Sequence, residues 1–322
     1  MYQFLELESP LDRDHLKVAV PDVERVQFDE PLTNDDYQLL AQVLEQCPHV
    51  TLRVYGYSQE LAGLDFLRLF PELRRFSVSN LMLLDDVSRL NVLPDDLEYL
   101  DLGETKRPLD LTPLKFSRLS GLRVVGHHRG LSELVARNHE LRVLSLWRLR
   151  FDQVLPIVAL PDLESLVLTL GSLTDSHWLA QFPSLRFLGI RQTRRLADLS
   201  PVRDLSKLEW LWLDTLSGVS LLPDFSANAA LVRADLDGLR SMQADNALEG
   251  LVTAPNLEQL SVSNSRLPVS AFEVLRSHPR LSFISVGLGS AKRNREVEDM
   301  LDVVAAPNIF QFARQQGISL IL

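Results

Sequence analysis

The chain is short of the residues on which many extracellular and membrane proteins depend. Its 322 residues include a single cysteine, Cys47, which excludes an intrachain disulfide framework and favours a reducing compartment. No apolar run approaches the roughly 18 residues of a membrane-spanning helix. The first residues carry no basic side chain before Arg13 and no apolar core of export-signal length. We therefore expect a cytoplasmic protein that makes no contact with a membrane.

Positive charge is also scarce. The 33 Lys and Arg residues are outnumbered by 43 Asp and Glu residues, which gives a formal net charge of −10. Binding to a phosphate backbone needs clustered Lys and Arg, so we expect no nucleic-acid partner. Acidic proteins associate most readily with basic surfaces. The composition therefore favours another protein, one with a basic patch, as the partner.

An internal repeat dominates the sequence. Its frame is apolar-x-x-apolar-x-apolar, a short strand whose fourth and sixth places point to the same side. The frame is cleanest at residues 163–168 and 208–213 and recurs about every 24 residues. The shortest step, 19 residues, separates Leu122 from Leu141. The copies begin at Val23, His49, Leu73, Leu97, Leu122, Leu141, Leu163, Leu185, Leu208, Leu231, Leu257 and Leu281, with a weaker thirteenth at Ile309.

The segments between the predicted strands differ in character. Proline precedes many frames by two residues, as at Pro307 before Ile309, and it stops the returning segment. Residues 34–46 predict a helix capped by Thr33 or Asn34, and residues 269–276 and 295–305 also predict helices. The proline-bearing segments 109–114 and 196–202 predict irregular or 3-10 turns.

The frame resembles the leucine-rich-repeat family over nearly the whole chain, with short repeats similar to the internalin type and longer ones closer to the ribonuclease-inhibitor type. The resemblance implies an α/β fold, a right-handed solenoid bent into a curved horseshoe. A parallel β-sheet would form its concave face, with short helices and 3-10 turns on the convex side. We expect one domain over residues 1–322. A cap at 1–22 would precede about twelve repeats at 23–289, and a second cap at 290–322 would hold the possible thirteenth repeat.

One departure from the family concerns the residue three places after the sixth-place leucine. The family usually has Asn or Cys there, to satisfy backbone groups at the turn. This chain has Thr105, Thr193 and Ser265 in some repeats and leucine in others, and Asn80 and Asn264 fall one place early. We therefore expect hydroxyl groups or water to supply the missing hydrogen bonds.

The candidate partner-binding residues come from the resemblance combined with strand alternation. If places four and six point inward, places three, five and seven line the concave face. Exposed Trp, Phe and Arg are typical of binding hot spots, and a row of acids could receive the Lys or Arg of a partner. The alternative is that the aromatic residues pack against one another across strands for stability alone. The candidates are Tyr99, His128, Trp147, Arg148, Phe187, Arg191, Trp210, Trp212, Asp214 and Asp235, with Asp237 beside them.

Residues that could carry chemistry are few and isolated. Cys47 aligns with core-facing places, so a buried cysteine is the better interpretation. His127 would point inward and His128 outward, which argues against a shared metal site. We therefore predict no catalytic residue, no metal site and no cofactor. The predicted function is a non-catalytic protein–protein interaction module that binds its partner on the concave face. It could act as an adaptor, as an inhibitor or immunity-type protein that neutralises a basic enzyme or toxin, or in a purely structural role. An enzyme with its site in the C-terminal cap is the less favoured alternative.

Overall fold

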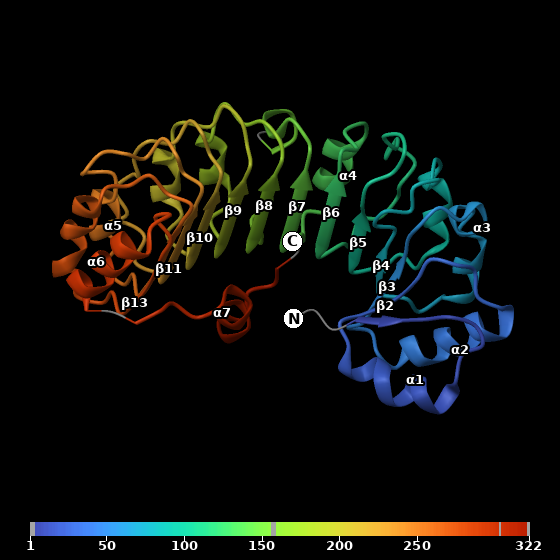
Figure 1. Ribbon diagram of the computed structural model, residues 1–322. Helices are drawn as coiled ribbons and strands as arrows, with labels where there is room; N and C mark the ends of the chain where they lie inside the picture. Colours follow the sequence, from blue (N-terminus) through green and yellow to red (C-terminus); the bar gives the residue numbers. More distant parts are fainter. Residues whose placement is uncertain (1–3, 156–158, 303, 321–322) are drawn as a thin grey trace. The chain divides into compact units, whose positions relative to one another are not determined.

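The computed structural model describes residues 4–155, 159–302 and 304–320 (Figure 1). It divides into two compact units, residues 1–141 and 142–322, which we call the first and the second unit. Both are built from short parallel strands joined by helices and turns, and within each unit the strands lie side by side in sequence order.

The first unit carries strands β1 to β6 and four α-helices. Its strands are β1 Phe4–Glu6, β2 Arg25–Phe28, β3 Thr51–Val54, β4 Arg75–Ser77, β5 Tyr99–Leu102 and β6 Gly121–Val125. Its α-helices are α1 Arg13–Ala19, α2 Asn34–Glu45, α3 Gln59–Ala62 and α4 Leu131–Arg137, and 3-10 helices span Val20–Asp22, Asp65–Leu69 and Val87–Val92.

The second unit carries strands β7 to β13. They are β7 Val143–Trp147, β8 Ser165–Thr169, β9 Phe187–Arg191, β10 Trp210–Asp214, β11 Arg233–Asp237, β12 Gln259–Ser263 and β13 Phe283–Val286. Its α-helices are α5 Glu249–Val252, α6 Ala291–Leu301 and α7 Ile309–Gln316, and 3-10 helices span Phe151–Gln153, His177–Gln181, Ser200–Asp204 and Val269–Ser277.

Stacked leucines form the core of each unit. In the repeat that contains β8, the leucines at places one, four and six, Leu163, Leu166 and Leu168, are fully buried. Neighbouring strands pair so that equal places of the frame face each other, as Leu166 faces Leu188. Complete burial of a leucine side chain contributes about 1.5–3 kcal/mol, so stacking the same places from repeat to repeat holds the sheet together. The predicted parallel sheet with short helices and 3-10 turns is confirmed.

The frame that contains β6 begins three residues earlier than predicted. Leu122 pairs with Leu100, which occupies place four of its own repeat, so the frame begins at Leu119 and not at Leu122. Leu119, Leu122 and Val124 are fully buried as places one, four and six. The step of 25 followed by one of 19 thus becomes two equal steps (119 − 97 = 22 and 141 − 119 = 22). The run Leu122-Arg123-Val124-Val125 has apolar residues in both alternating registers, so the apolar pattern alone also fits a frame that begins at Leu122.

Place eight of the frame turns the chain out of the strand in a left-handed conformation. Asn80 and Asn264 have φ of 66° and 50° there, and Gly126 has φ of 74°. Asparagine and glycine tolerate this conformation better than other residues do. The asparagines that fall one place early are therefore turn residues. Place nine is filled by buried leucines in four repeats, namely Leu81, Leu149, Leu216 and Leu239.

The predicted helices are confirmed in part. Helix α2 begins at Asn34, and the Thr33 hydroxyl caps it by accepting a hydrogen bond from the Asp36 amide at 3.2 Å. Residues 269–277 form a 3-10 helix, and α6 begins at Ala291, four residues before the predicted start. None of the described helices has the length and apolar character needed to cross a membrane.

The predicted thirteenth repeat is wrong. Residues from Ile309 form helix α7 and no strand, because Ile309, Phe312 and Ala313 share one face at helical spacing. The Asn308 side chain caps the first turn, and Gly317 ends the helix with φ of 63°. At the other end of the chain, the expected cap contains helix α1 and also strand β1, which pairs in parallel with β2.

Candidate partner-binding surfaces

The side chains at places three, five and seven of the frame point away from the leucine core. We call the surface they form the outward sheet face. In the second unit, helix α7 lies on this face, on the side of the strands opposite α5 and the return segments (Figure 1). The C-terminal segment of the chain therefore occupies part of the surface that was predicted to bind a partner.

An aromatic cluster joins α7 to the sheet. Phe312 of α7 and Trp210 of β10 are both fully buried, with ring centroids 5.5 Å apart and ring planes at 84°. The ring of Phe187 in β9 also packs on Trp210, with 4.4 Å between the ring centroids. Val167, Ala313 and Ile318 complete the buried set, and Trp212 lies at its partly exposed edge. Rings arranged edge to face contribute about 0.5–1.5 kcal/mol beyond the burial of their area.

Polar contacts fix the segment at both ends of α7. The Arg186 guanidinium donates to the carbonyl oxygen of Gln316 at 2.8 Å, and that of Arg233 donates to the carbonyl oxygen of Pro307 at 2.8 Å. Just before the helix, the amide of Ala306 donates to Ser285 Oγ at 3.1 Å. Each of these bonds uses a main-chain group of the C-terminal segment, so its side chains dock through apolar contacts.

A buried ion pair lies under the aromatic cluster. Arg233 binds both carboxylate oxygens of Asp235, at 2.7 Å from Nε and 2.9 Å from Nη2. Trp210 Nε1 also donates to Asp235, at 2.6 Å, and Arg233 donates to Gln259 Oε1 at 2.9 Å. A buried carboxylate needs such a set of donors to offset its loss of water. Asp235 thus serves to hold Trp210 and Arg233 in place.

The structure corrects two sequence expectations in the second unit. Phe187 and Trp210 were expected to be exposed, and both are fully buried beneath α7. Asp214 and Asp235 were expected to form an acidic edge open to a partner, and each is paired within the chain: Asp214 with Arg191 at 3.2 Å and Asp235 with Arg233. The burial of Phe187 and Trp210 was missed because the segment that covers them was predicted to be another strand. The two acids were predicted to be open because strand alternation does not show which arginines lie beside them.

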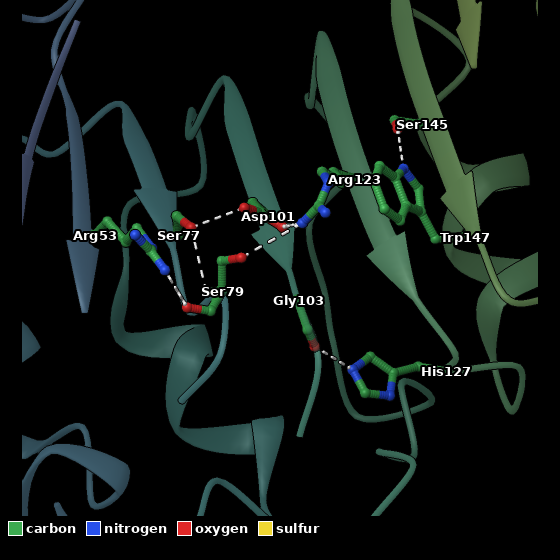
Figure 2. A network of polar contacts seen from close by, with 9 residues as sticks. All are labelled: Arg53, Ser77, Ser79, Asp101, Gly103, Arg123, His127, Ser145 and Trp147. Carbon is green, nitrogen blue, oxygen red and sulfur yellow. Dashed lines mark hydrogen bonds and ion pairs between the residues drawn. The ribbon is translucent and has the colours of Figure 1, made fainter. Parts of the chain in front are cut away.

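The remaining second-unit candidates are accessible to different degrees. Trp212 is half-buried, with the Arg191 guanidinium 4.2 Å from its ring centroid. Trp147 is half-buried at place seven of β7, and its Nε1 donates to Ser145 Oγ at 3.0 Å (Figure 2). Arg148 is exposed at the left-handed place eight, with φ of 57°. These residues keep the accessibility that a binding role requires.

Two candidates belong to the first unit. Tyr99 lies at place three of β5 and is buried except for 7% of its surface. His128 was assigned to place seven of a strand, and because the frame begins at Leu119 it lies in the exposed turn after β6. Val125, which was read as inward, takes place seven instead. The correction also brings Arg123 onto the outward sheet face, where Figure 2 shows it beside Asp101.

The residues that could act as a nucleophile or as metal ligands are buried in the core or lie far from one another. Cys47 is a buried free thiol, and burial raises its pKa. Such a thiol is a poor nucleophile, because the thiolate is the reactive form. In the part of the chain that the structure describes, no three His, Cys, Asp or Glu side chains lie close enough together to hold a metal ion.

Comparison with solved structures agrees with the geometry of the repeats. An internalin (inlF) from Listeria monocytogenes aligns over 92% of this chain and 90% of its own, with 17% sequence identity and a TM-score of 0.54. The structure of a TLR13–ssRNA13 complex aligns over 88% of this chain at 17% identity and a TM-score of 0.57, and this chain spans 44% of that one. The chain has the leucine-rich-repeat fold. A Leptospira interrogans LRR protein aligns at 15% identity over 94% of this chain and all of its own, with a TM-score of 0.35. No protein-family model and no curated protein sequence matches the chain.

Within the leucine-rich-repeat frame, His127 occupies place nine, where the family usually has asparagine. Counting from Leu119, it is the residue three places after Val124. Its Nδ1 accepts a hydrogen bond from the Leu109 amide at 3.1 Å, so Nε2 carries the proton and donates to the Gly103 carbonyl oxygen at 2.9 Å (Figure 2). Burial is the main cause that lowers its pKa. His127 therefore satisfies turn backbone groups as a neutral ring.

Proposed function

We propose that this leucine-rich-repeat chain is a non-catalytic protein-interaction module. Its second-unit outward sheet face would bind an amphipathic helix of another protein in the place that α7 occupies. The observation that carries this proposal is the burial of Trp210 and Phe187 against Phe312 of α7. A sheet face that already receives one amphipathic helix has the shape and chemistry to receive another.

The character of the α7 contact supports this proposal. The second-unit face presents the residue types of binding hot spots, with Trp210, Trp212 and Arg233 close together. The two arginines that bind the C-terminal segment, Arg186 and Arg233, donate to main-chain carbonyl oxygens, those of Gln316 and Pro307. A helix with apolar side chains at places i, i+3 and i+4 could offer Arg186 a carbonyl oxygen of its last turn, as Gln316 does. The requirement on the partner is therefore an apolar stripe and not a particular sequence.

The net charge of −10 bears on the kind of partner. Asp214 and Asp235 are paired within the chain. A basic partner would therefore be attracted by the net negative charge of the whole chain and not by contacts with these two carboxylates. Long-range attraction of this kind raises association rates and weakens with added salt. We propose a partner with a basic patch on this ground. The same charge favours the second candidate function, an inhibitor or immunity-type protein that neutralises a basic enzyme or toxin.

A peptide that reproduces residues 304–320 tests whether the face accepts a helix. In Phe312→Asp, the carboxylate would have to enter the aromatic cluster, so α7 should detach and leave the face open. We expect the labelled peptide to bind this variant in fluorescence anisotropy and to bind the wild-type chain more weakly, because the chain's own α7 competes. A peptide that carries Phe312→Asp itself should not bind.

The matched control is Gln311→Ala, which changes an exposed residue of the same helix and should behave as the wild type. If the Phe312→Asp chain keeps its circular dichroism spectrum, loses amide protection in α7 and still fails to bind the peptide, the proposal is wrong. For the natural partner, cross-links from the captured protein should map to the neighbourhood of Trp212 and Arg191.

A further inference from the structure

Four arginines lie on the outward sheet face of the first unit. Arg25 of β2 and Arg75 of β4 occupy place three, while Arg53 of β3 and Arg123 of β6 occupy place five. Adjacent strands lie ~4.8 Å apart, so β2 and β4 are separated by about 10 Å. Guanidinium groups from alternate strands can therefore reach one small ligand between them. This arginine cluster is unexpected in a chain with a net charge of −10.

Most of the positive charge in the arginine cluster has no counter-ion. Arg123 pairs with Asp101 at 3.0 Å (Figure 2), but among residues 4–155 no carboxylate forms an ion pair with Arg25, Arg53 or Arg75. Three carboxylates lie near the cluster. Asp101 pairs with Arg123, Glu6 accepts hydrogen bonds from Gln27 and Tyr55, and Asp29 lies close enough to Tyr55 to raise its pKa. The local sum is four positive charges less three negative charges, a surplus of one.

The donors of the arginine cluster are only partly used. Arg53 donates to Gln27 Oε1 at 2.9 Å and to the Ser79 carbonyl oxygen, and Arg75 donates through Nε to Thr51 Oγ1 at 3.3 Å. In the described part of the first unit, Arg25 has no hydrogen-bond partner, and its Nε is buried. An unsatisfied buried donor is costly, so the described chain leaves Arg25 short of hydrogen-bond acceptors.

Tyr99 of β5 lies directly opposite Arg75 of β4 in the sheet. Its ring is buried, with the Arg75 guanidinium 4.7 Å from the ring centroid. Burial is the main cause that raises its pKa; Asp101 raises it further, while the charges of Arg123, Arg75 and Arg25 act in the opposite direction. The hydroxyl therefore stays protonated at neutral pH. Among the residues that the structure describes, it has no hydrogen-bond acceptor, so it is available as a donor.

The positive charge of Arg53 is also only partly balanced by nearby negative charge. Burial, followed by repulsion from Arg25, lowers the pKa of its guanidinium, while the attraction of Asp101 and Glu6 offsets part of this effect. An anion bound between Arg25 and Arg75 would reverse the balance of these effects, because a nearby negative charge favours the protonated guanidinium.

We propose that Arg25, Arg75 and the Tyr99 hydroxyl form a binding site for a phosphate-type oxyanion, either free phosphate or a phosphate monoester. The surplus of positive charge favours an anion at this place. The donors come from three strands, β2, β4 and β5, and a tetrahedral oxyanion offers oxygens in the several directions that such donors require. Thr51 of β3 lies between Arg25 of β2 and Arg75 of β4, and its hydroxyl accepts a hydrogen bond that orients Arg75.

The test titrates the full-length chain with inorganic phosphate, O-phosphoserine and acetate at matched ionic strength, followed by calorimetry. We expect saturable binding of both phosphate compounds and weaker binding of acetate. Arg25→Ala and Arg75→Ala should each lower the phosphate affinity roughly tenfold, because each removes a charge-assisted hydrogen bond. The 15N signal of Arg25 Nε should shift on addition of phosphate, which reports on the site directly.

Arg118→Ala is the matched control, since it removes one exposed positive charge from the same unit outside the arginine cluster. Equal loss of phosphate affinity in Arg118→Ala would show that only the general charge matters and would overturn the proposal. Equal binding of acetate and phosphate would also overturn it. Binding of free phosphate alone would identify the free ion as the ligand, whereas equal binding of O-phosphoserine would extend the site to phosphate esters.

Discussion

The ring of Phe312 in α7 stands edge-on against Trp210 of β10, with 5.5 Å between the ring centroids. This contact connects the C-terminal segment to the centre of the second-unit sheet. It explains why Trp210, at place three of its frame on the outward sheet face, has no contact with solvent. Because the contact joins α7 to the sheet, α7 could detach while the repeats stay folded.

Phe312→Ala should detach α7 without unfolding the repeats. Removing a buried phenylalanine side chain costs about 3–5 kcal/mol where the surroundings stay in place. An end segment can dissociate instead, so we expect the global unfolding midpoint to move by less than this cost implies. Tryptophan emission should shift to longer wavelength as Trp210 meets water, and amide exchange should accelerate in α7. Gln311→Ala should show neither effect.

Asp235→Ala should destabilise the second unit by about 3–5 kcal/mol, because it leaves Arg233 charged and buried without its partner. It also removes the acceptor of Trp210 Nε1. Urea denaturation followed by tryptophan fluorescence measures the change. Asp162→Ala removes an exposed carboxylate from the same unit and should leave the midpoint unchanged. A similar midpoint in both variants would show that the Arg233–Asp235 pair contributes little to stability.

The stability of the first unit should fall as the pH drops below about 6.5, the usual pKa of histidine. Because the pKa of His127 is lowered in the folded chain, the unfolded chain binds more protons in the window below 6.5. The contribution of the neutral ring is therefore fully present above that pH and is lost as the pH falls towards the folded-state pKa. Melting temperatures measured from pH 7.5 to 5 should show this decline.

His127→Asn should reduce the dependence of stability on pH. Asparagine is the residue that other leucine-rich repeats use at place nine, and its amide can accept from one backbone group and donate to another, as the His127 ring does with Leu109 and Gly103. His128→Asn changes an exposed histidine next to it and should keep the wild-type pH profile. If the two variants have the same profile, His127 is not the group responsible.

Gly126→Ala and Gly130→Ala should differ in cost although both glycines have positive φ, 74° and 76°. A Cβ at Gly126 would meet no atom within 4 Å, so only the left-handed backbone is penalised, by about 1–2 kcal/mol. A Cβ at Gly130 would lie within 2.4 Å of the Thr112 amide nitrogen, and the backbone there would have to move. Chemical denaturation should therefore show the larger loss for Gly130→Ala.

Much of the fold could be predicted from the spacing of apolar residues, because burial of the inward places dictates that spacing. The frames that begin at Leu163 and Leu208, for example, have the strands where periodicity put them. The frame of β6 was misplaced because Val124 and Val125 are both apolar, and periodicity alone cannot tell which of them points inward. The left-handed residue at place eight, Gly126, is the local signal that identifies the correct frame.

The candidate binding surface was predicted less well, because accessibility depends on contacts between residues distant in sequence. Strand alternation correctly put Trp210 and Phe187 on the outward sheet face. Alternation carries no information about what covers that face. The helical spacing of Ile309, Phe312 and Ala313, with a capping Asn308 and a terminal Gly317, was the available signal for α7. A proline two residues before Ile309 suggested a strand and concealed that signal.

The segment between α6 and α7 has a consequence for self-association. Val304 forms a single parallel bridge with Phe283: its carbonyl oxygen accepts from the Ile284 amide at 2.7 Å, and its amide donates to the Ser282 carbonyl oxygen at 3.4 Å. These bonds saturate part of the free edge of β13, where a strand from a second copy would otherwise add. Joining two copies at β13 would first require the chain to give up its own bonds, which disfavours growth into filaments and aggregates.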